Sequence, residues 1–199
     1  MKLRLLKRAY NFVNHIYYSF KIDHLGYRSL IYNPLILRGG VISVGNKTII
    51  RPKVWLEANP LTGEGKAEIK IGNGCSIGHF NEIYATKSIV IEDKVLTADR
   101  VYISDNLHGY ERFDIPVIDQ QIKQIKTVHI GEGSWLGVGV AVIGANIGKH
   151  CVIGANAVVT KDVPDYSVAV GIPAKVIKRY NFETERWEKT NPDGSFMNK

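Results

Sequence analysis

Residues 147–159 read IGKHCVIGANAVV and repeat with a period of six. An aliphatic residue opens each repeat, a glycine follows it in both complete repeats, and a small residue comes four positions after it. The aliphatic residues of this stretch are Ile147, Ile153 and Val159. A helix repeats about every 3.6 residues and a strand about every two, so neither explains the pattern. A fixed short repeat indicates the stacked coils of a solenoid.

The same six-residue period extends through most of the chain. Its other clear positions are Ile71, Ile77 and Ile83, then Ile91, Thr97 and Ile103, then Ile130 and Leu136. One hexad predicts a short flat strand and a tight corner, so three hexads close a triangular coil. The residue that opens each hexad should point inward, and the glycine should tolerate a sharp backbone at the corner. The sequence therefore predicts an all-β solenoid, a parallel β-helix, over residues 25–180.

The two ends of the chain depart from the repeat. Residues 1–24 mix aliphatic and aromatic residues with lysines and arginines, which predicts an amphipathic helix. This helix either caps the open apolar end of the solenoid or makes peripheral contact with an anionic membrane, and the cap is favoured. No stretch reaches the roughly 20 apolar residues of a membrane span. Residues 181–199 are charged and predict a short helix or a tail.

The longest interruption of the repeat covers residues 104–127. A loop of this length inside a compact repeat is usually functional or disordered. It contains His108, whose ordinary pKa of about 6.5 suits proton transfer at neutral pH. Asp105 and Glu111 lie near it in sequence and are candidates for orienting its imidazole. A histidine in a polar loop is often only a solvated residue, so His108 needs further support.

Composition narrows the choice of partners and compartment. The net charge of +7 indicates an anionic partner, although solvated lysines would give the same figure. No basic run is interleaved with aromatic residues, so nucleic acid is not expected. Cys75 and Cys151 fall on the small inward position of the hexad, which predicts buried thiols and a reducing, cytoplasmic setting. Zinc spacing of cysteine and histidine is absent, so no metal is expected.

A second candidate site lies at the end of the repeat. Lys161, Lys175 and Lys178 could bind phosphates as point charges, or they could form a solvated basic end. Here the sequence resembles the hexapeptide-repeat acyltransferases, most of all the galactoside, maltose and bacterial surface-polysaccharide O-acetyltransferases. The resemblance rests on the hexads, on WLG at 135–137, on GANAVVTKD at 154–162 and on GIPAK at 171–175.

The resemblance implies a left-handed β-helix, which departs from the right-handed rule for parallel crossovers. It implies a homotrimer with active sites between subunits, acetyl-CoA as co-substrate, and His108 as the catalytic histidine. On the acceptor side, Asn81 is the nearest counterpart of the family's asparagine, together with Asp105 and Tyr110; Asn81 could instead be a hydrogen-bonded inward residue. The residues implied to contact CoA are Val138, Ala155, Thr160, Lys161, Lys175 and Lys178.

The resemblance further implies that His108 acts as general base on a hydroxyl of a sugar acceptor. The resulting alkoxide attacks the thioester, and backbone N–H groups stabilise the oxyanion. The acceptor would be a bacterial surface polysaccharide or its precursor, modified in the cytoplasm or at the inner face of the membrane. Three alternatives remain: an N-acetyltransferase of a nucleotide-linked amino sugar, a non-catalytic scaffold, and a zinc carbonic anhydrase. The last needs three convergent histidines, and only His108 and His129 lie near the loop.

Overall fold

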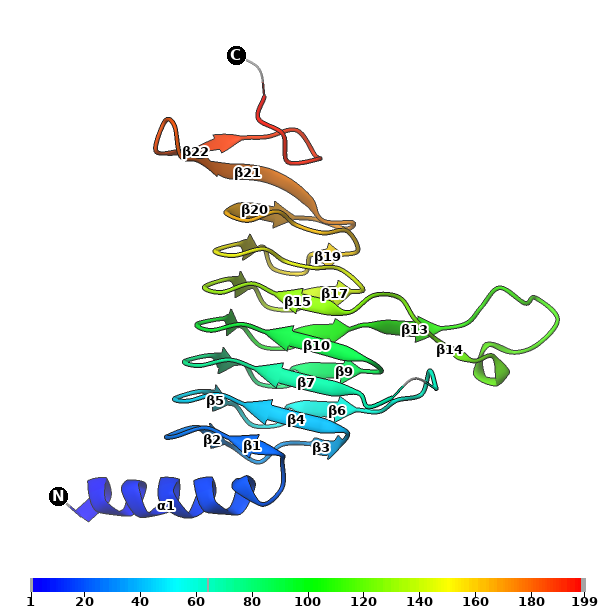
Figure 1. Ribbon diagram of the computed structural model, residues 1–199. Helices are drawn as coiled ribbons and strands as arrows, with labels where there is room; N and C mark the ends of the chain where they lie inside the picture. The colour runs from blue at the N-terminus through cyan, green and yellow to red at the C-terminus, as the bar shows by residue number, and fades with distance from the viewer. Residues whose placement is uncertain (1, 64, 198–199) are drawn as a thin grey trace.

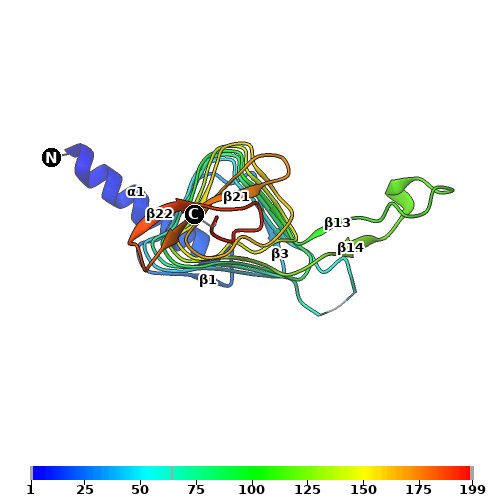
Figure 2. The ribbon, with the colours of Figure 1, turned by 90° about the horizontal axis from the view of Figure 1, so that it is seen from above.

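The computed structural model describes residues 2–63 and 65–197. Figure 1 shows one helix across the N-terminal end and a stack of coils above it. Viewed along the stack in Figure 2, the coils superimpose as a triangle. Within the coils, neighbouring strands of each side run parallel. The molecule is a left-handed parallel β-helix, so the predicted fold class is confirmed.

Each side of the triangle is one sheet. The first sheet contains β1 (His24–Leu25), β4 (Val41–Val44), β7 (Glu68–Ile71), β10 (Ser88–Ile91) and β15 (Val128–Ile130). The second contains β2 (Leu30–Ile31), β5 (Ile49–Ile50), β8 (Ser76–Ile77), β11 (Leu96–Thr97), β16 (Trp135–Leu136), β18 (Val152–Ile153), β20 (Ser167–Val170), β21 (Lys175–Asn181) and β22 (Arg186–Lys189). The third contains β3 (Ile36–Gly39), β6 (Trp55–Ala58), β9 (Glu82–Ala85), β12 (Tyr102–Ser104), β17 (Ala141–Ile143) and β19 (Val158–Val159).

The inward residues form continuous ladders through the stack. In the third sheet each ladder residue lies in register with the next, and all are at most 1% exposed: Leu56, Ile83, Ile103, Val142 and Val159. Fully burying such a side chain stabilises the fold by roughly 1.5–3 kcal/mol. Because each ladder residue packs between the coils above and below, the core runs the length of the stack. The predicted inward positions of the hexad are therefore confirmed.

The glycines of the hexads have a different role from the predicted one. Gly78 and Gly148 do not have a left-handed backbone; that conformation falls two positions later, at Phe80 (φ 55°) and His150 (φ 50°). A Cβ at Gly78 would lie 2.2 Å from the carbonyl oxygen of Ala98 in the next coil. A Cβ at Gly148 would lie 2.5 Å from a backbone nitrogen. Glycine is needed at these positions because stacked coils approach closely there.

The N-terminal helix α1 (Lys2–Ser19) lies against β1 and β2 of the first coil. It begins to cover this end of the solenoid, but much of it projects beyond the triangle (Figure 2). It contacts the first coil through Asn14 and His15 and packs Tyr18 against the hydrophobic core, while its other large apolar side chains stay exposed, so it caps this end only in part. Among the described residues, no helix is long and apolar enough to cross a bilayer.

The C-terminal segment forms strands, and the predicted helix or tail is wrong. β21 pairs antiparallel with β20, and β22 pairs antiparallel with β21. An uncovered β20 would present a row of unpaired backbone groups at the end of the stack, and this hairpin occupies them. The boundary expected at residue 180 falls inside β21 (Lys175–Asn181), so the solenoid and its last segment are continuous.

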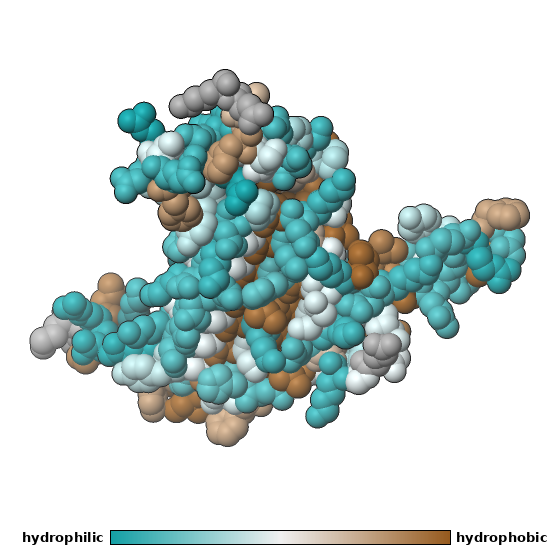
Figure 3. All heavy atoms as spheres, turned by 45° about the horizontal axis from the view of Figure 1, so that its top comes forward, coloured by the Kyte–Doolittle hydropathy of each residue, from teal (hydrophilic) through white to brown (hydrophobic). Residues whose placement is uncertain are grey.

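The interruption at residues 104–127 forms an arm. Its strands β13 (Asn106–His108) and β14 (Ile122–Gln124) are antiparallel, and the 3-10 helix η1 (Val117–Asp119) lies between them in the chain. The arm leaves the corner between the third and first sheets and extends away from the triangle (Figures 1 and 2). Figure 3 shows hydrophobic atoms at the base and tip of this otherwise largely hydrophilic projection.

Candidate functional site

His108 is the last residue of β13, at the base of the arm, where it lies opposite Ile122. Its side chain is exposed. Within the described part of the chain, its ring makes no hydrogen bond. A general base must reach its proton donor directly or through one water. The ring of His108 is therefore free to meet an external hydroxyl, as a solvated histidine would also be.

Asp105 is a structural residue, and its predicted role in acceptor binding is corrected here. It is fully buried and its carboxylate accepts five hydrogen bonds. The backbone N–H groups of Thr86, Lys87 and Ser88 donate three of them at 2.7–2.9 Å. Asp105 thus fixes the corner of the coil below, and its oxygens have no exposed surface for an acceptor.

The two residues next in line, Tyr110 and Glu111, contact each other rather than His108. The Glu111 carboxylate forms an ion pair with Lys123 across the arm and accepts the backbone N–H of Tyr110 at 3.0 Å. The Lys123 hydrogen bond is the main reason why the pKa of Glu111 lies below its ordinary value. The Tyr110 ring is 66% exposed. Neither Asp105 nor Glu111 orients the imidazole of His108 within one chain.

Asn81 is the inward, hydrogen-bonded residue that the sequence left as an alternative. Its side chain is fully buried, donates to the carbonyl of Ala98 at 2.7 Å and accepts the Thr97 hydroxyl at 2.6 Å. The Thr97 oxygen in turn accepts the backbone N–H of Gly78 at 3.0 Å. Its expected role in acceptor binding is therefore wrong, because the amide satisfies the backbone of stacked coils and has no surface for a ligand.

The third sheet carries a surface that the sequence analysis did not identify. Trp55, Glu82, Tyr84 and Tyr102 line a shallow pocket of about 190 Å³. They occupy outward positions of β6, β9 and β12, and β12 leads into the arm that holds His108. Aromatic walls with a few polar groups are typical of small-ligand sites. The signal was the alternation along each strand, since Ile83 points inward while Glu82 and Tyr84 point outward. We call these four residues the third-sheet pocket.

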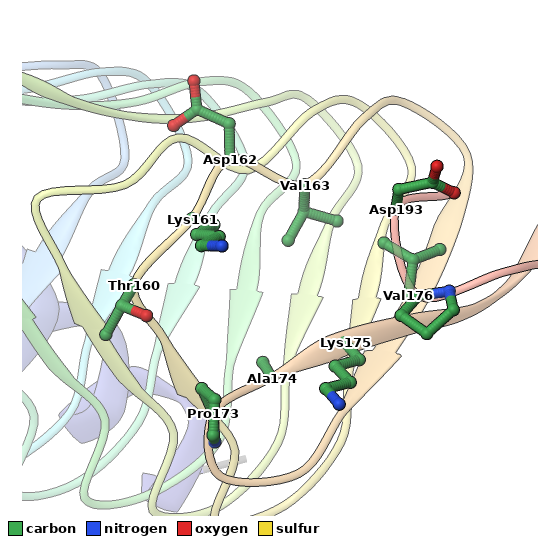
Figure 4. A pocket seen from close by; sticks show the side chains of 10 residues that line it. Thr160, Lys161, Asp162, Val163, Pro173, Ala174, Lys175, Val176 and Asp193 are labelled. Atoms are coloured by element: carbon green, nitrogen blue, oxygen red, sulfur yellow. The ribbon is translucent and has the colours of Figure 1, made fainter. Parts of the chain in front are cut away.

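A larger pocket of about 520 Å³ lies near the C-terminal end of the stack and contains three of the predicted CoA residues, Thr160, Lys161 and Lys175. Figure 4 shows Lys161 and Lys175 on different walls of this hollow, one from the corner after β19 and one from the start of β21. The other lining residues are Asp162, Val163, Pro173, Ala174, Val176, Pro192 and Asp193. We call it the lysine pocket.

The lysine pocket contains two lysines and two aspartates, and both aspartates accept hydrogen bonds from other residues, Asp193 from the backbone N–H and hydroxyl of Ser195. Lys161 and Lys175 form no ion pair in the described residues, whereas Asp162 binds Lys126 at 2.5 Å and the Asn146 backbone N–H at 2.9 Å. Burial acts to raise the pKa of Asp162, but these two hydrogen bonds outweigh it and hold the pKa below its ordinary value. Figure 4 shows the Asp162 carboxylate turned away from Lys161. Two exposed ammonium groups therefore remain available for phosphate, which lysine binds as a point charge.

The remaining predicted CoA residues lie outside this pocket. Lys178 is on β21 between Val168 and Lys189, and it does not line the pocket. Val138 and Ala155 are exposed at the corner between the second and third sheets, in consecutive coils. The predicted CoA set is thus spread over both edges of the third sheet. β17 separates β12 from β19, so the lysine pocket lies about 10 Å along the stack from the coil of His108.

The described residues contain no group of three His, Cys, Asp or Glu side chains that could hold a metal ion. His129, the second histidine near the arm in sequence, interacts with Glu92, with the His129 Nε2 atom 3.1 Å from a carboxylate oxygen. His79 interacts in the same way with Asp99 at 3.1 Å. His108 differs from both, because no carboxylate binds its ring.

The relatives found by comparison with known proteins are named as acetyltransferases. No family model matches the sequence. A Mycobacterium tuberculosis protein provisionally named an acetyltransferase is 38% identical over 149 residues, which cover 74% of this chain and 45% of that protein. An Escherichia coli protein provisionally named a lipopolysaccharide biosynthesis O-acetyl transferase is 35% identical over 132 residues, 63% of this chain and 67% of that protein. The chain therefore spans less than half of the mycobacterial relative.

Among solved structures, a galactoside acetyltransferase in complex with coenzyme A is similar in both sequence and fold. It is 28% identical, with a TM-score of 0.53, and the similarity covers 65% of this chain and 63% of that one.

Proposed function

This chain belongs to the hexapeptide-repeat acyltransferases, and we propose that it transfers an acetyl group from acetyl-CoA to a sugar hydroxyl. The acceptor is a bacterial surface polysaccharide or its precursor. One observation carries the proposal: an exposed His108 without a ring hydrogen bond follows β12, whose Tyr102 lines an aromatic pocket, and Lys161 and Lys175 line a second pocket two coils further along the stack. A scaffold needs none of these three features.

In this mechanism Nδ1 or Nε2 of His108 accepts the proton of the acceptor hydroxyl. The hydroxyl oxygen attacks the thioester carbonyl carbon, and the oxyanion is stabilised by backbone N–H groups. The C–S bond then breaks, and the imidazolium returns the proton to the departing thiolate. Lys161 and Lys175 bind the phosphates of the donor, with Thr160 beside them. The third-sheet pocket receives the sugar, whose ring stacks on Trp55, Tyr84 or Tyr102.

The active assembly in this proposal is a homotrimer. At the tip of the arm, Phe113 and Ile118 are 101% and 84% exposed, and the arm extends away from its own solenoid. Side chains of this kind gain stability when they are buried against a neighbour. A neighbouring subunit also explains why His108 has no orienting partner within its own chain. We place the trimer in the cytoplasm, with the N-terminal helix available for peripheral contact with the membrane.

The test is release of free CoA from acetyl-CoA, measured over a panel of sugars, glycans and amino sugars. We expect release that depends on a hydroxyl acceptor and an acetyl ester in the product. Replacement His108→Ala should lower the rate about 10²–10⁴-fold, because a general base contributes that much. His129→Ala is the matched control, since His129 is also exposed and near the arm, and it should keep most activity.

Two results would contradict the proposal. Near-normal turnover by a correctly folded His108→Ala variant, checked by circular dichroism, would exclude His108 as the base. An amide product formed only with amino sugars would replace O-acetylation by N-acetylation.

A further inference from the structure

The N-terminal helix contacts the solenoid through a mainly polar side, on which Tyr18 also packs against the hydrophobic core. The side-chain amide of Asn14 donates to the carbonyl of Ile31 at 2.8 Å and accepts the Ile31 backbone N–H at 3.2 Å. A ring nitrogen of His15 lies 3.0 Å from the carbonyl of Ser29. Asn14 is 8% exposed and is buried against the first coil. These bonds fix the rotation of α1 about its own axis.

The opposite side of α1 is apolar and uncovered. At about 100° per residue, the apolar residues occupy roughly half of the helix circumference, centred opposite the contact residues Asn11, Asn14 and His15 taken together. The exposed members of this face are Leu3, Leu5, Leu6, Phe12, Val13, Ile16 and Tyr17, with exposures from 41% to 83%. Phe20, just beyond the helix, is 83% exposed. An amphipathic helix of a globular domain normally turns this face to the core.

The charges around this face all have one sign. The sequence of α1 contains Lys2, Arg4, Lys7 and Arg8 and no acidic residue, and Lys21 follows it. An apolar face bordered by lysine and arginine is typical of helices that lie in the interface of a membrane. Anionic lipids attract such basic segments.

A groove beside the apolar face also combines apolar and basic side chains. It measures about 540 Å³ and lies between α1 and the first coil, and its lining residues are Arg8, Asn11, Phe12, His15, Tyr27, Arg28 and Leu30. Arg8 and Arg28 come from different elements, the helix and the turn before β2, so the groove combines two guanidinium groups with apolar walls. Guanidinium groups bind phosphate oxygens in a bidentate manner.

We propose that α1 docks this end of the solenoid on a bilayer that contains anionic phospholipid, with a lipid phosphate held between Arg8 and Arg28. Figure 1 shows α1 lying across the stack, so its free face can rest on a flat surface while the solenoid stands above it. A second copy of the chain is a weaker match. Helix pairing uses a narrow apolar stripe, whereas this face is about twice as wide. The basic residues at its border would also repel those of an identical helix.

The experiment is co-sedimentation of the full chain with vesicles of phosphatidylcholine alone or mixed with phosphatidylglycerol. Wild-type protein should bind only the mixed vesicles. The double variant Leu6→Glu and Val13→Glu, at the centre of the apolar face, should bind at least tenfold more weakly. Leu35→Glu is the matched control, because Leu35 is an exposed apolar residue (58%) outside α1, and it should bind as wild type does.

A second pair of measurements tests the groove. Arg8→Ala with Arg28→Ala should reduce the preference for phosphatidylglycerol, and inorganic phosphate should not compete with vesicles, since a free ion has no apolar part. Equal vesicle binding by wild type and by the Leu6/Val13 variant would overturn the proposal. A fall in mass of that variant by light scattering, without vesicle binding by wild type, would assign the face to a second copy. CoA release in solution should be unchanged in all these variants, which separates this proposal from the enzymatic one.

Discussion

The position of a residue in the hexad decides its environment. Cys75 and Cys151 occupy the small inward position, each is 1% exposed, and their thiols donate to the carbonyls of Glu92 (3.0 Å) and Pro164 (3.1 Å). Burial raises the pKa of both thiols, and that of Cys151 rises to about 11. Both are therefore neutral at physiological pH, as expected for thiols that serve packing rather than chemistry.

The raised pKa of Cys151 predicts a loss of stability at high pH. The folded state keeps the proton more tightly than the unfolded state, so the stabilisation is present below pH 9 and is lost as pH rises toward about 11. The change should reach about 3 kcal/mol at most. Urea unfolding of wild type and Cys151→Ala at several pH values measures it. The variant should show a flatter decline above pH 9, and identical declines would show that Cys151 does not titrate as proposed.

Two lysines that differ in position by three residues should differ in donor binding. Lys175 lines the lysine pocket and Lys178 does not. Lys161→Ala with Lys175→Ala should weaken binding of CoA about tenfold or more and reduce its dependence on salt, because two exposed phosphate contacts that salt screens are lost. Lys178→Ala is the matched control and should bind CoA nearly as wild type does. Calorimetry measures the affinity of each variant for CoA. A similar affinity in the double variant would show that the lysine pocket is a solvated basic end that does not bind CoA.

At the scale of elements, the arm and the coil below it are joined by one buried carboxylate. Asp105 starts the arm, immediately after β12, and binds the corner between β9 and β10 at residues 86–88. The return strand is joined as well, since the backbone N–H of Ile125 donates to the carbonyl of Asp105 at 2.8 Å. The position of His108, three residues further along, depends on this junction.

Asp105→Asn should therefore destabilise the fold. An amide offers one acceptor oxygen in place of two, so at least one buried N–H of residues 86–88 loses its partner, which costs about 1–3 kcal/mol. The free energy of unfolding in urea should fall by this amount. Asp119→Asn, on the exposed 3-10 helix η1 of the same arm, is the control and should leave stability unchanged. An unaltered stability of Asp105→Asn would mean that the corner is held by other contacts.

At the scale of the whole molecule, one chain holds the parts of the site without enclosing them. The third-sheet pocket spans three coils and ends at β12, which leads to His108, the lysine pocket lies two coils beyond β12, and the arm projects outward. A site assembled between neighbouring subunits would enclose the space between these parts. Closed symmetry is the usual form of such assemblies.

Light scattering on the purified chain should give about 67 kDa, three times 22.3 kDa. Phe113→Asp with Ile118→Asp should lower the mass toward one chain and remove most activity, because charged side chains at the arm tip prevent its burial against a neighbour. Leu35→Glu is the control, because it changes an exposed apolar residue away from the arm, and it should leave the mass and the activity unchanged. A monomer of full activity at micromolar concentration would count decisively against a site between subunits.

The sequence determined the solenoid, the interruption and the place of His108. A hexad residue packs only on the coils directly above and below, so a local pattern defines the ladder from Leu56 to Val159. The arm was visible because residues 104–127 break that pattern. The lysines at 161 and 175 could be identified because they stand in the run that closes the repeat.

Only the tertiary structure decided the remaining features, because each depends on contacts between segments far apart in sequence. The polar side of α1 faces the solenoid since Asn14 finds the backbone of Ile31, and no period within the helix encodes that choice. Asn81 and Asp105 are buried because donors from other coils satisfy them. The C-terminal segment is a hairpin because β20 offers an open edge. Its pairing also separates Lys175, in the pocket, from Lys178, outside it.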